Sequence, residues 1–326
     1  PQGMKPMKRR GGRNFRYRSG QRRYRFVDRR SRALRLLLTA ALCCVMALCA
    51  FQLIRYAADA RRAKRASAEL REIYYAQPDE TEVPAETPPA AEETAMPAAA
   101  EETAAADRLR AVLYPNNPYA TVSSRFRKLR RQNQDIVGWL TIDGMLDEAV
   151  VQRDNAYYLT RDYRGYHNAN GAIFLEETCA LDTRPYTLLL YGHNMKTGAM
   201  FGGLRNYETL RYYKANPFIT FDTAYEEGEY VIFAAGTVSV TPGNTDSVNV
   251  AALSSASISQ RTEALEALLR CSVYQNAPDV CAEDQILVLM TCASDDSERR
   301  IVAARRLREG ETREDVEAAV ERVRKR

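Results

Sequence analysis

Histidine is almost absent from this sequence, since only His167 and His193 occur among its 326 residues. Cysteine is also sparse, with seven residues, and none of them outside the apolar segment described below forms a Cys-x-x-Cys pair. Structural zinc sites are built from clusters of these ligands at short spacings. The sequence therefore argues against a structural zinc site, and it predicts no metal and no cofactor.

Charged residues are missing from Leu36 to Ile54, a mainly apolar run of 19 residues. At about 1.5 Å per residue, a helix of this length covers roughly 28 Å, about the thickness of a hydrocarbon core. The preceding residues 1–35 hold fourteen Lys and Arg against one Asp. By the positive-inside rule, residues 1–35 are predicted to form a cytoplasmic tail and residues 36–54 a single-pass signal anchor, with the remainder outside the cell.

Two other interpretations of this N-terminal region are less favoured. Basic arms also bind nucleic acid, but an adjacent membrane span makes the membrane the predicted partner, with no nucleic acid. A cleaved signal peptide has an apolar region of about 7–15 residues, which is shorter than this one. The basic residues just after Ile54 do not outweigh the excess before Leu36.

Basic residues are missing from Gln77 to Asp107, a stretch with nine acids, five prolines and ten alanines among 31 residues. Such a composition cannot bury enough apolar area to order itself, so it predicts a disordered linker that holds the domain away from the membrane. Residues 55–107 are thus expected to form a short juxtamembrane helix and this acidic linker. A folded extracellular domain is expected over 108–310, followed by a C-terminal helix over 311–326.

The predicted domain is mainly β. Its N-terminal part, "TVSSRFRKLRRQ", indicates a helix capped by Ser123 or Ser124, and a longer helix is expected near Ser259 to Cys271, where it is inserted between late strands. Many short strands with few helices favour a closed β-barrel of about eight strands. The predicted strands are "IVGWLTI", "EAVVQ", "GAIFLE", "YTLLLYG", "PFITFD", "GEYVIFAAGTVSV", "QILVLMTC" and "RRIVAARRL".

His193 and Cys292 each stand where an apolar run gives way to a polar loop. The run "TLLL" leads into "YGHNMKTGAMFGGL", and "ILVLMTC" leads into "ASDDSE". Alone, such a histidine is more often a surface residue and such a cysteine a packed core residue. If both strands end at the same rim of one barrel, thiol and imidazole meet, and imidazole is the usual activator of a cysteine nucleophile. His167, in "YRGYHNANG", is predicted to be a plain loop residue.

Arg299 and Arg300 begin the last predicted strand. Successive strand residues face opposite ways, so only one of them can face the side of Cys292. A guanidinium there would favour the thiolate and could bind a developing oxyanion. A solvated pair of surface arginines is the alternative on these residues alone.

In these motifs the sequence resembles the class B sortases, membrane-anchored cysteine transpeptidases of Gram-positive bacteria. The resemblance rests on "YGHNMKTGAMFGGLRNY", "LMTC" and an arginine eight residues beyond the cysteine, and it extends in order through "DIVGWLTIDG", "VVQRDNAYYLTRDYRG", "GAIFLE" and "FDTAYEEGEYVIFA". It covers about residues 122–308. It implies a sortase-like barrel in which Cys292 is the nucleophile, His193 the general acid/base and Arg300, directly before "IV", the stabilising arginine.

The same resemblance implies where substrate binds. Asn155, Leu159 and Thr291 match positions that contact substrate in the family, and residues 241–278 match the insertion that marks class B and helps to hold substrate. The family usually reads Thr-Leu-Ser/x-Thr-Cys, and here Val288 and Met290 occupy the first and third of those positions. Many members have serine at the latter position, and methionine cannot donate the hydrogen bond that serine could.

The function that the resemblance implies is transpeptidation at the cell membrane. The predicted partners are exported proteins with a C-terminal sorting signal, cleaved after Thr through a thioacyl intermediate, and a peptidoglycan precursor that supplies the accepting amine. Two alternatives stay open. The first is a secreted cysteine peptidase with water as acceptor, and the second is a non-catalytic module that binds cell wall or peptides.

Overall fold

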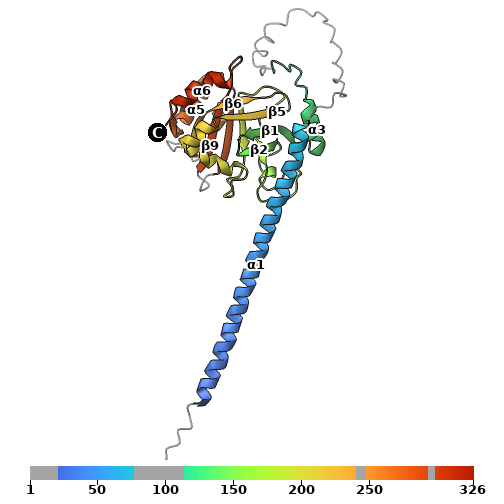
Figure 1. Cartoon of the computed structure of the whole chain (residues 1–326), viewed down its shortest axis with the longest axis vertical. Coiled ribbons are helices and arrows are strands. Elements are labelled where there is room, and N and C mark those ends of the chain that lie inside the picture. The colour runs from blue at the N-terminus through green and yellow to red at the C-terminus, as the bar shows by residue number, and fades with distance from the viewer. Residues whose placement is uncertain (1–20, 77–113, 240–246, 293–297) are drawn as a thin grey trace, which may run out of the picture. The chain divides into compact units, whose positions relative to one another are not determined.

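The computed structural model describes residues 21–76, 114–239, 247–292 and 298–326 (Figure 1). These belong to two compact units, residues 1–58 and residues 59–326. The acidic segment predicted to be a disordered linker lies outside the described residues, and so do the tail residues 1–20.

Helix α1, Gln21–Tyr75, contains the predicted membrane span. It is the one helix in the described part of the chain that is long and apolar enough to cross a membrane. Its large apolar side chains between residues 34 and 54 are all more than half exposed, as they would be in contact with lipid tails. The second unit begins further along the same helix, at Asp59.

The second unit is built on a closed barrel, and the barrel prediction is confirmed. Eight strands close in the order β1-β2-β3-β4-β8-β9-β6-β5. Each corresponds to one of the eight strands expected from the sequence. Their bounds are β1 Ile136–Ile142, β2 Leu146–Val151, β3 Ile173–Leu175, β4 Thr187–Tyr191, β5 Phe218–Thr223, β6 Glu229–Ser239, β8 Ile286–Cys292 and β9 Glu298–Arg306.

Helices decorate the barrel, and the long inserted helix lies between β6 and β8 as predicted. The described elements outside the barrel are η1 Tyr157–Leu159, α3 Ser124–Gln132, η2 Phe201–Glu208, α4 Leu210–Ala215, η3 Val250–Ser254, α5 Ile258–Cys271, α6 Arg313–Arg322 and the two-residue strands β7 Tyr274–Gln275 and β10 Arg324–Lys325, which pair with each other. Helices α5 and α6 lie on the side of the barrel away from α3 (Figure 1).

Strand alternation divides the buried side chains into an inner and an outer set. Leu287 and Leu289 of β8 pack with the barrel core, whereas Val288 and Met290 pack with the inner stripe of α5. The same α5 cluster contains Leu265 and the other buried apolar residues of that helix. Met290, one of the two departures from the family pattern that the sequence resembles, is therefore a packed residue between β8 and α5.

The end of α1, from Asp59 onward, belongs to the second unit and packs directly on the barrel. Leu70 and Tyr74 are buried, and the Tyr74 ring stacks on Trp139 with ring centroids 4.3 Å apart and an interplanar angle of 8°. The Tyr74 hydroxyl donates to the Asp222 carboxylate. A juxtamembrane helix was predicted here, but its packing on the barrel was not. The sequence of a helix end does not show which strand its aromatic residues contact.

Tyr74→Ala is expected to lower the free energy of unfolding by about 3 kcal/mol, as for other buried aromatic residues replaced by alanine. The lost terms are the stacking contact with Trp139 and the apolar area that the ring buries. Denaturant unfolding of the detergent-solubilised chain, followed through the fluorescence of Trp139, measures the difference.

Tyr75→Ala is the matched control for this prediction. Tyr75 is the next residue of the same helix, but its side chain is 58% exposed and meets Trp139 only edge-on, with centroids 6.4 Å apart. Its loss is expected to cost under about 1 kcal/mol. Equal losses for the two variants would contradict the docked position of Tyr74.

Candidate active site

The ends of β4 and β8 bring the predicted histidine and cysteine to one rim of the barrel. The two strands are neighbours and run parallel, with Tyr191 opposite Met290. The amide of Gly192 donates to the Met290 carbonyl at 3.2 Å, which extends the pairing beyond β4. His193 lies two residues beyond Tyr191 and Cys292 two residues beyond Met290, so the backbone register sets them at the same level.

Leu159 and Gly171 fix the imidazole of His193. The Nε2 atom lies 2.6 Å from the Leu159 carbonyl oxygen. A carbonyl only accepts, so Nε2 carries a proton and Nδ1 is the nitrogen that can gain and lose the second one. Gly171 has φ +60°, and a Cβ there would meet His193 Cδ2 at 3.0 Å and the Leu159 carbonyl oxygen at 2.8 Å. The absence of a side chain at Gly171 is thus what lets η1 and the His193 ring meet.

The loop after His193 folds back on itself, which explains its glycines. The His193 carbonyl accepts from the amides of Met195 at 3.1 Å and Phe201 at 3.0 Å. A Cβ on Gly192 would meet the Phe201 ring at 2.8 Å. Phe201 begins η2, whose buried residues pack into the barrel core. The glycine-rich loop therefore packs closely against the backbone of His193.

The other cysteines outside the span are poor nucleophiles. Burial, and to a smaller extent the nearby Glu176 carboxylate, raises the pKa of the Cys179 thiol to about 12. The pKa of the Cys281 thiol is raised as well, first by desolvation and then by Asp284. Cys271 and Cys281 form no disulfide. Cys292 ends β8, and its side chain lies outside the described residues.

The two arginines of β9 occupy different places. In the antiparallel ladder Arg299 is opposite Cys292 and Arg300 is opposite Thr291. An Arg299 Nη1 donates to the Glu298 carbonyl at 3.0 Å. Its charge also acts on Tyr191, whose pKa is nevertheless raised, because burial and Glu176 outweigh the arginine.

Arg300, the arginine predicted from the sequence, is largely buried, with 17% of its side chain exposed. Its Nη1 forms an ion pair with the Glu208 carboxylate at the end of η2. Its Nε is buried and has no hydrogen-bond partner among the described residues. A buried donor without a partner is costly, so a ligand that supplies an acceptor would relieve that cost.

The three predicted substrate-binding residues differ in what the structure leaves accessible. Thr291 is buried and Leu159 is 40% exposed, with its carbonyl on His193. The Asn155 side chain is occupied internally, donating to Glu176 Oε1 at 3.1 Å and accepting from the Glu177 amide at 3.0 Å. Asn155 thus joins the loops that follow β2 and β3, and only the Leu159 side chain is open to a ligand. Residues 241–246 of the predicted insertion lie outside the described part.

Two further site features could not be found from the sequence. Gly171 and Glu208 are brought to the site only by folding, and in the sequence they read as an ordinary loop glycine and a surface acid. Within the described residues no group of three or more His, Cys, Asp or Glu is arranged to hold a metal ion.

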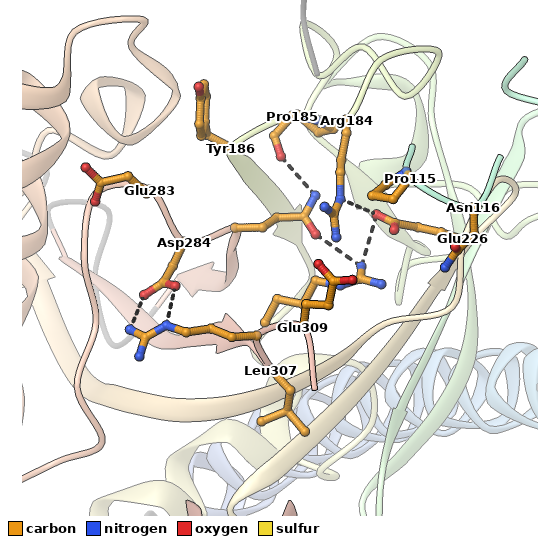
Figure 2. A pocket seen from close by; sticks show the side chains of 13 residues that line it. Pro115, Asn116, Arg184, Pro185, Tyr186, Glu226, Glu283, Asp284, Leu307 and Glu309 are labelled. Carbon is orange, nitrogen blue, oxygen red and sulfur yellow. Dashed lines mark hydrogen bonds and ion pairs between the residues drawn. The ribbon is translucent and has the colours of Figure 1, made fainter. Parts of the chain in front are cut away.

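A separate pocket of about 450 Å³ lies at the other end of the barrel (Figure 2). Its wall includes Arg184 before β4 and Asp284 before β8, so it faces away from the rim with His193. Glu226 pairs there with Arg184 at 3.1 Å and Arg306 at 3.0 Å. Asp284 pairs with Arg308 at 2.9 Å. These paired charges tie strand ends together.

The chain is similar to several known proteins. No known protein-family model matches the chain. Sortase B of Listeria monocytogenes is 31% identical over 178 residues, which is 54% of this chain and 70% of that protein. Sortase B of Staphylococcus aureus is 28% identical over 192 residues, which is 57% of this chain and 75% of that protein. The crystal structure of sortase B from Bacillus anthracis in complex with AAEK1 superimposes with a TM-score of 0.56 and 25% identity, over 76% of this chain and 97% of that one.

Proposed function

Because this chain belongs to the class B sortases, a family of cysteine transpeptidases, we propose that it cleaves the C-terminal sorting signal of exported proteins after a threonine and joins them to an amine of a peptidoglycan precursor. Cys292 is the nucleophile, His193 the general acid/base and Arg300 the group that stabilises the oxyanion.

The first half-reaction forms a thioacyl enzyme. The Cys292 thiolate attacks the threonine carbonyl carbon, and the negative charge moves to the carbonyl oxygen. When the C–N bond breaks, the His193 imidazolium gives its proton to the leaving amine. A cation close to the sulfur favours the thiolate form of the nucleophile.

The second half-reaction transfers the acyl group. The acceptor amine attacks the thioester carbonyl and loses a proton to neutral His193. The new amide bond forms, the C–S bond breaks and the Cys292 thiolate is regenerated. Asn155, Leu159 and Thr291 belong to the substrate side of the site, Leu159 by its exposed side chain and Asn155 by fixing the loops around it.

The observation that carries this proposal is the parallel pairing of β4 with β8, with Tyr191 opposite Met290. Any other arrangement of these two strands would separate the acid/base from the thiol. The Nε2 contact of His193 with Leu159 adds support, since it leaves Nδ1 as the nitrogen that exchanges protons.

The proposed location follows from α1. Its apolar stretch anchors the chain in the cell membrane, and the basic residues 1–35 keep the N-terminus in the cytoplasm. The barrel is then extracellular, where exported proteins and wall precursors meet.

The test is cleavage of a panel of sorting-signal peptides by the detergent-solubilised chain, with and without an amine acceptor. A transpeptidase gives amide products that grow with amine concentration. Water-only products at saturating amine would instead favour a secreted peptidase. Failure of a thiol-reactive sorting-peptide analogue to label the protein would favour a non-catalytic binding module.

Arg300→Ala is expected to lower kcat/KM for peptide cleavage by about 10²–10³-fold, the usual loss when one oxyanion donor is removed. Arg299→Ala is the matched control and is expected to lower it by less than about 10-fold, because its guanidinium already donates to the Glu298 carbonyl. Equal losses, or a larger loss for Arg299→Ala, would shift the role to the residue opposite Cys292 in the ladder.

A further inference from the structure

Glu208 contacts the predicted catalytic arginine from a different part of the chain. It is the last residue of η2, and its Oε1 pairs with Nη1 of Arg300, 92 positions later. Its own side chain is 49% exposed. An ion pair whose carboxylate is half exposed adds about 1 kcal/mol to stability, so its contribution to the fold is small.

The 3₁₀ helix η2 is a rigid base for that carboxylate. Leu204 and Tyr207 are buried in the barrel core. The Tyr207 carbonyl accepts from the Tyr274 hydroxyl, and the Tyr207 hydroxyl donates to the Asn216 carbonyl at 2.9 Å. The residue before Glu208 is thus held on both its backbone and its side chain, so the backbone under Glu208 is fixed.

The same helix also begins at the acid/base. The Phe201 amide, the first of η2, donates to the His193 carbonyl at 3.0 Å. Its last residue, Glu208, holds Arg300. One element of eight residues, five of them buried, therefore contacts both groups.

Arg300 keeps donors available while it is held. A guanidinium has five N–H donors in a fixed plane, so fixing one nitrogen fixes the direction of the others. Glu208 engages Nη1, and the buried Nε has no hydrogen-bond partner among the described residues. The carboxylate orients the guanidinium and does not block it.

We propose that Glu208 is a positioning residue, which orients Arg300 so that a guanidinium N–H that the carboxylate does not engage donates to the carbonyl oxygen of the scissile bond as that oxygen becomes negative. This inference rests on the proposed function. Loss of the carboxylate frees the arginine to adopt other rotamers, so it lowers the rate of bond cleavage more than it weakens substrate binding.

The experiment compares Glu208→Gln and Glu208→Ala with the wild-type chain in steady-state peptide cleavage. Both variants are expected to lower kcat by about 10-fold or more with KM changed by less than about 2-fold. In an Arg300→Ala background Glu208→Gln is expected to cause no further loss, since residues that act as one unit are not additive. Labelling of Cys292 by a small uncharged thiol reagent should keep its wild-type rate.

Glu229→Gln is the control, because it breaks an ion pair with Arg313 that is 2.7 Å long and similarly exposed, away from the rim. It should leave kcat unchanged. A wild-type chain that cleaves peptide while Glu208→Gln retains its kcat would overturn the inference alone. The inference would also be overturned if Glu208→Gln lowered kcat in the Arg300→Ala background by the same factor as in the wild-type chain. A wild-type chain that cleaves no sorting peptide would overturn the proposed function, and the inference with it.

Discussion

Cys292→Ala is expected to abolish peptide cleavage and transfer, with a loss in kcat of at least about 10⁴-fold, because without the sulfur no thioacyl intermediate can form. The substitution removes one atom at the end of β8, so the barrel should remain folded. Steady-state assays measure the loss, and circular dichroism with thermal unfolding tests the fold. Mass spectrometry of the acid-quenched wild-type reaction should also show a peptide thioester on Cys292.

Cys281→Ala is the matched control. Cys281 is exposed and free, and it precedes β8, at the opposite end of the strand from Cys292. Its pKa is raised, so little thiolate forms there at neutral pH. Its replacement should leave both activity and thioester formation unchanged. Loss of activity in Cys281→Ala, or a thioester that survives in Cys292→Ala, would remove Cys292 from the role of nucleophile.

The barrel could be predicted because each of its strands has a recognisable pattern in its own short stretch of sequence. Each of the eight segments alternates or runs apolar over the length of a strand and ends at a turn, and β1 begins and ends where the sequence placed it. The short pair β7 and β10 was missed, because two residues each carry no periodic signal. The docking of Tyr74 on Trp139 was missed for another reason: it depends on which helix face meets which strand, and no local pattern records that.

The meeting of His193 and Cys292 was predicted only as a condition, that two apolar runs end at one rim. The parallel pairing of β4 with β8 is a long-range property, so the sequence could state the condition but not decide it. The groups that position His193 are a backbone carbonyl, that of Leu159, and a missing side chain, at Gly171. A motif search selects residues by their side chains, so it would find neither of these two groups.

The choice between Arg299 and Arg300 shows a limit of a different kind. Alternation along a strand says that the two face opposite ways, but only the ladder tells which one stands opposite Cys292. It sets Arg299 there, while the family pattern and the contact with Glu208 favour Arg300. Both lie at the start of β9, where it pairs with the end of β8, so kinetic measurements must decide the role.

His193→Ala is expected to lower kcat by about 10²–10⁴-fold, the range for loss of a general acid/base. The leaving amine would then depart without a proton donor, and the accepting amine would have no base. Added imidazole should restore part of the rate, because the space left beside Leu159 and Gly171 has the size of the lost ring. Steady-state kinetics across pH, with and without imidazole, measure both effects.

His167→Ala separates a catalytic role from a general effect of losing a histidine. His167 is exposed in a loop and contributes to a different surface pocket, next to Asp162 and Arg164. Its removal should change neither kcat nor the pH profile. Because the Leu159 carbonyl can bind water once the ring is gone, His193→Ala should also unfold within about 2 °C of the wild type. A folded His193→Ala enzyme with its full rate would contradict the role of His193, because some other group would then protonate the leaving amine. That group could not be a histidine at this rim, since the only other histidine of the sequence is His167.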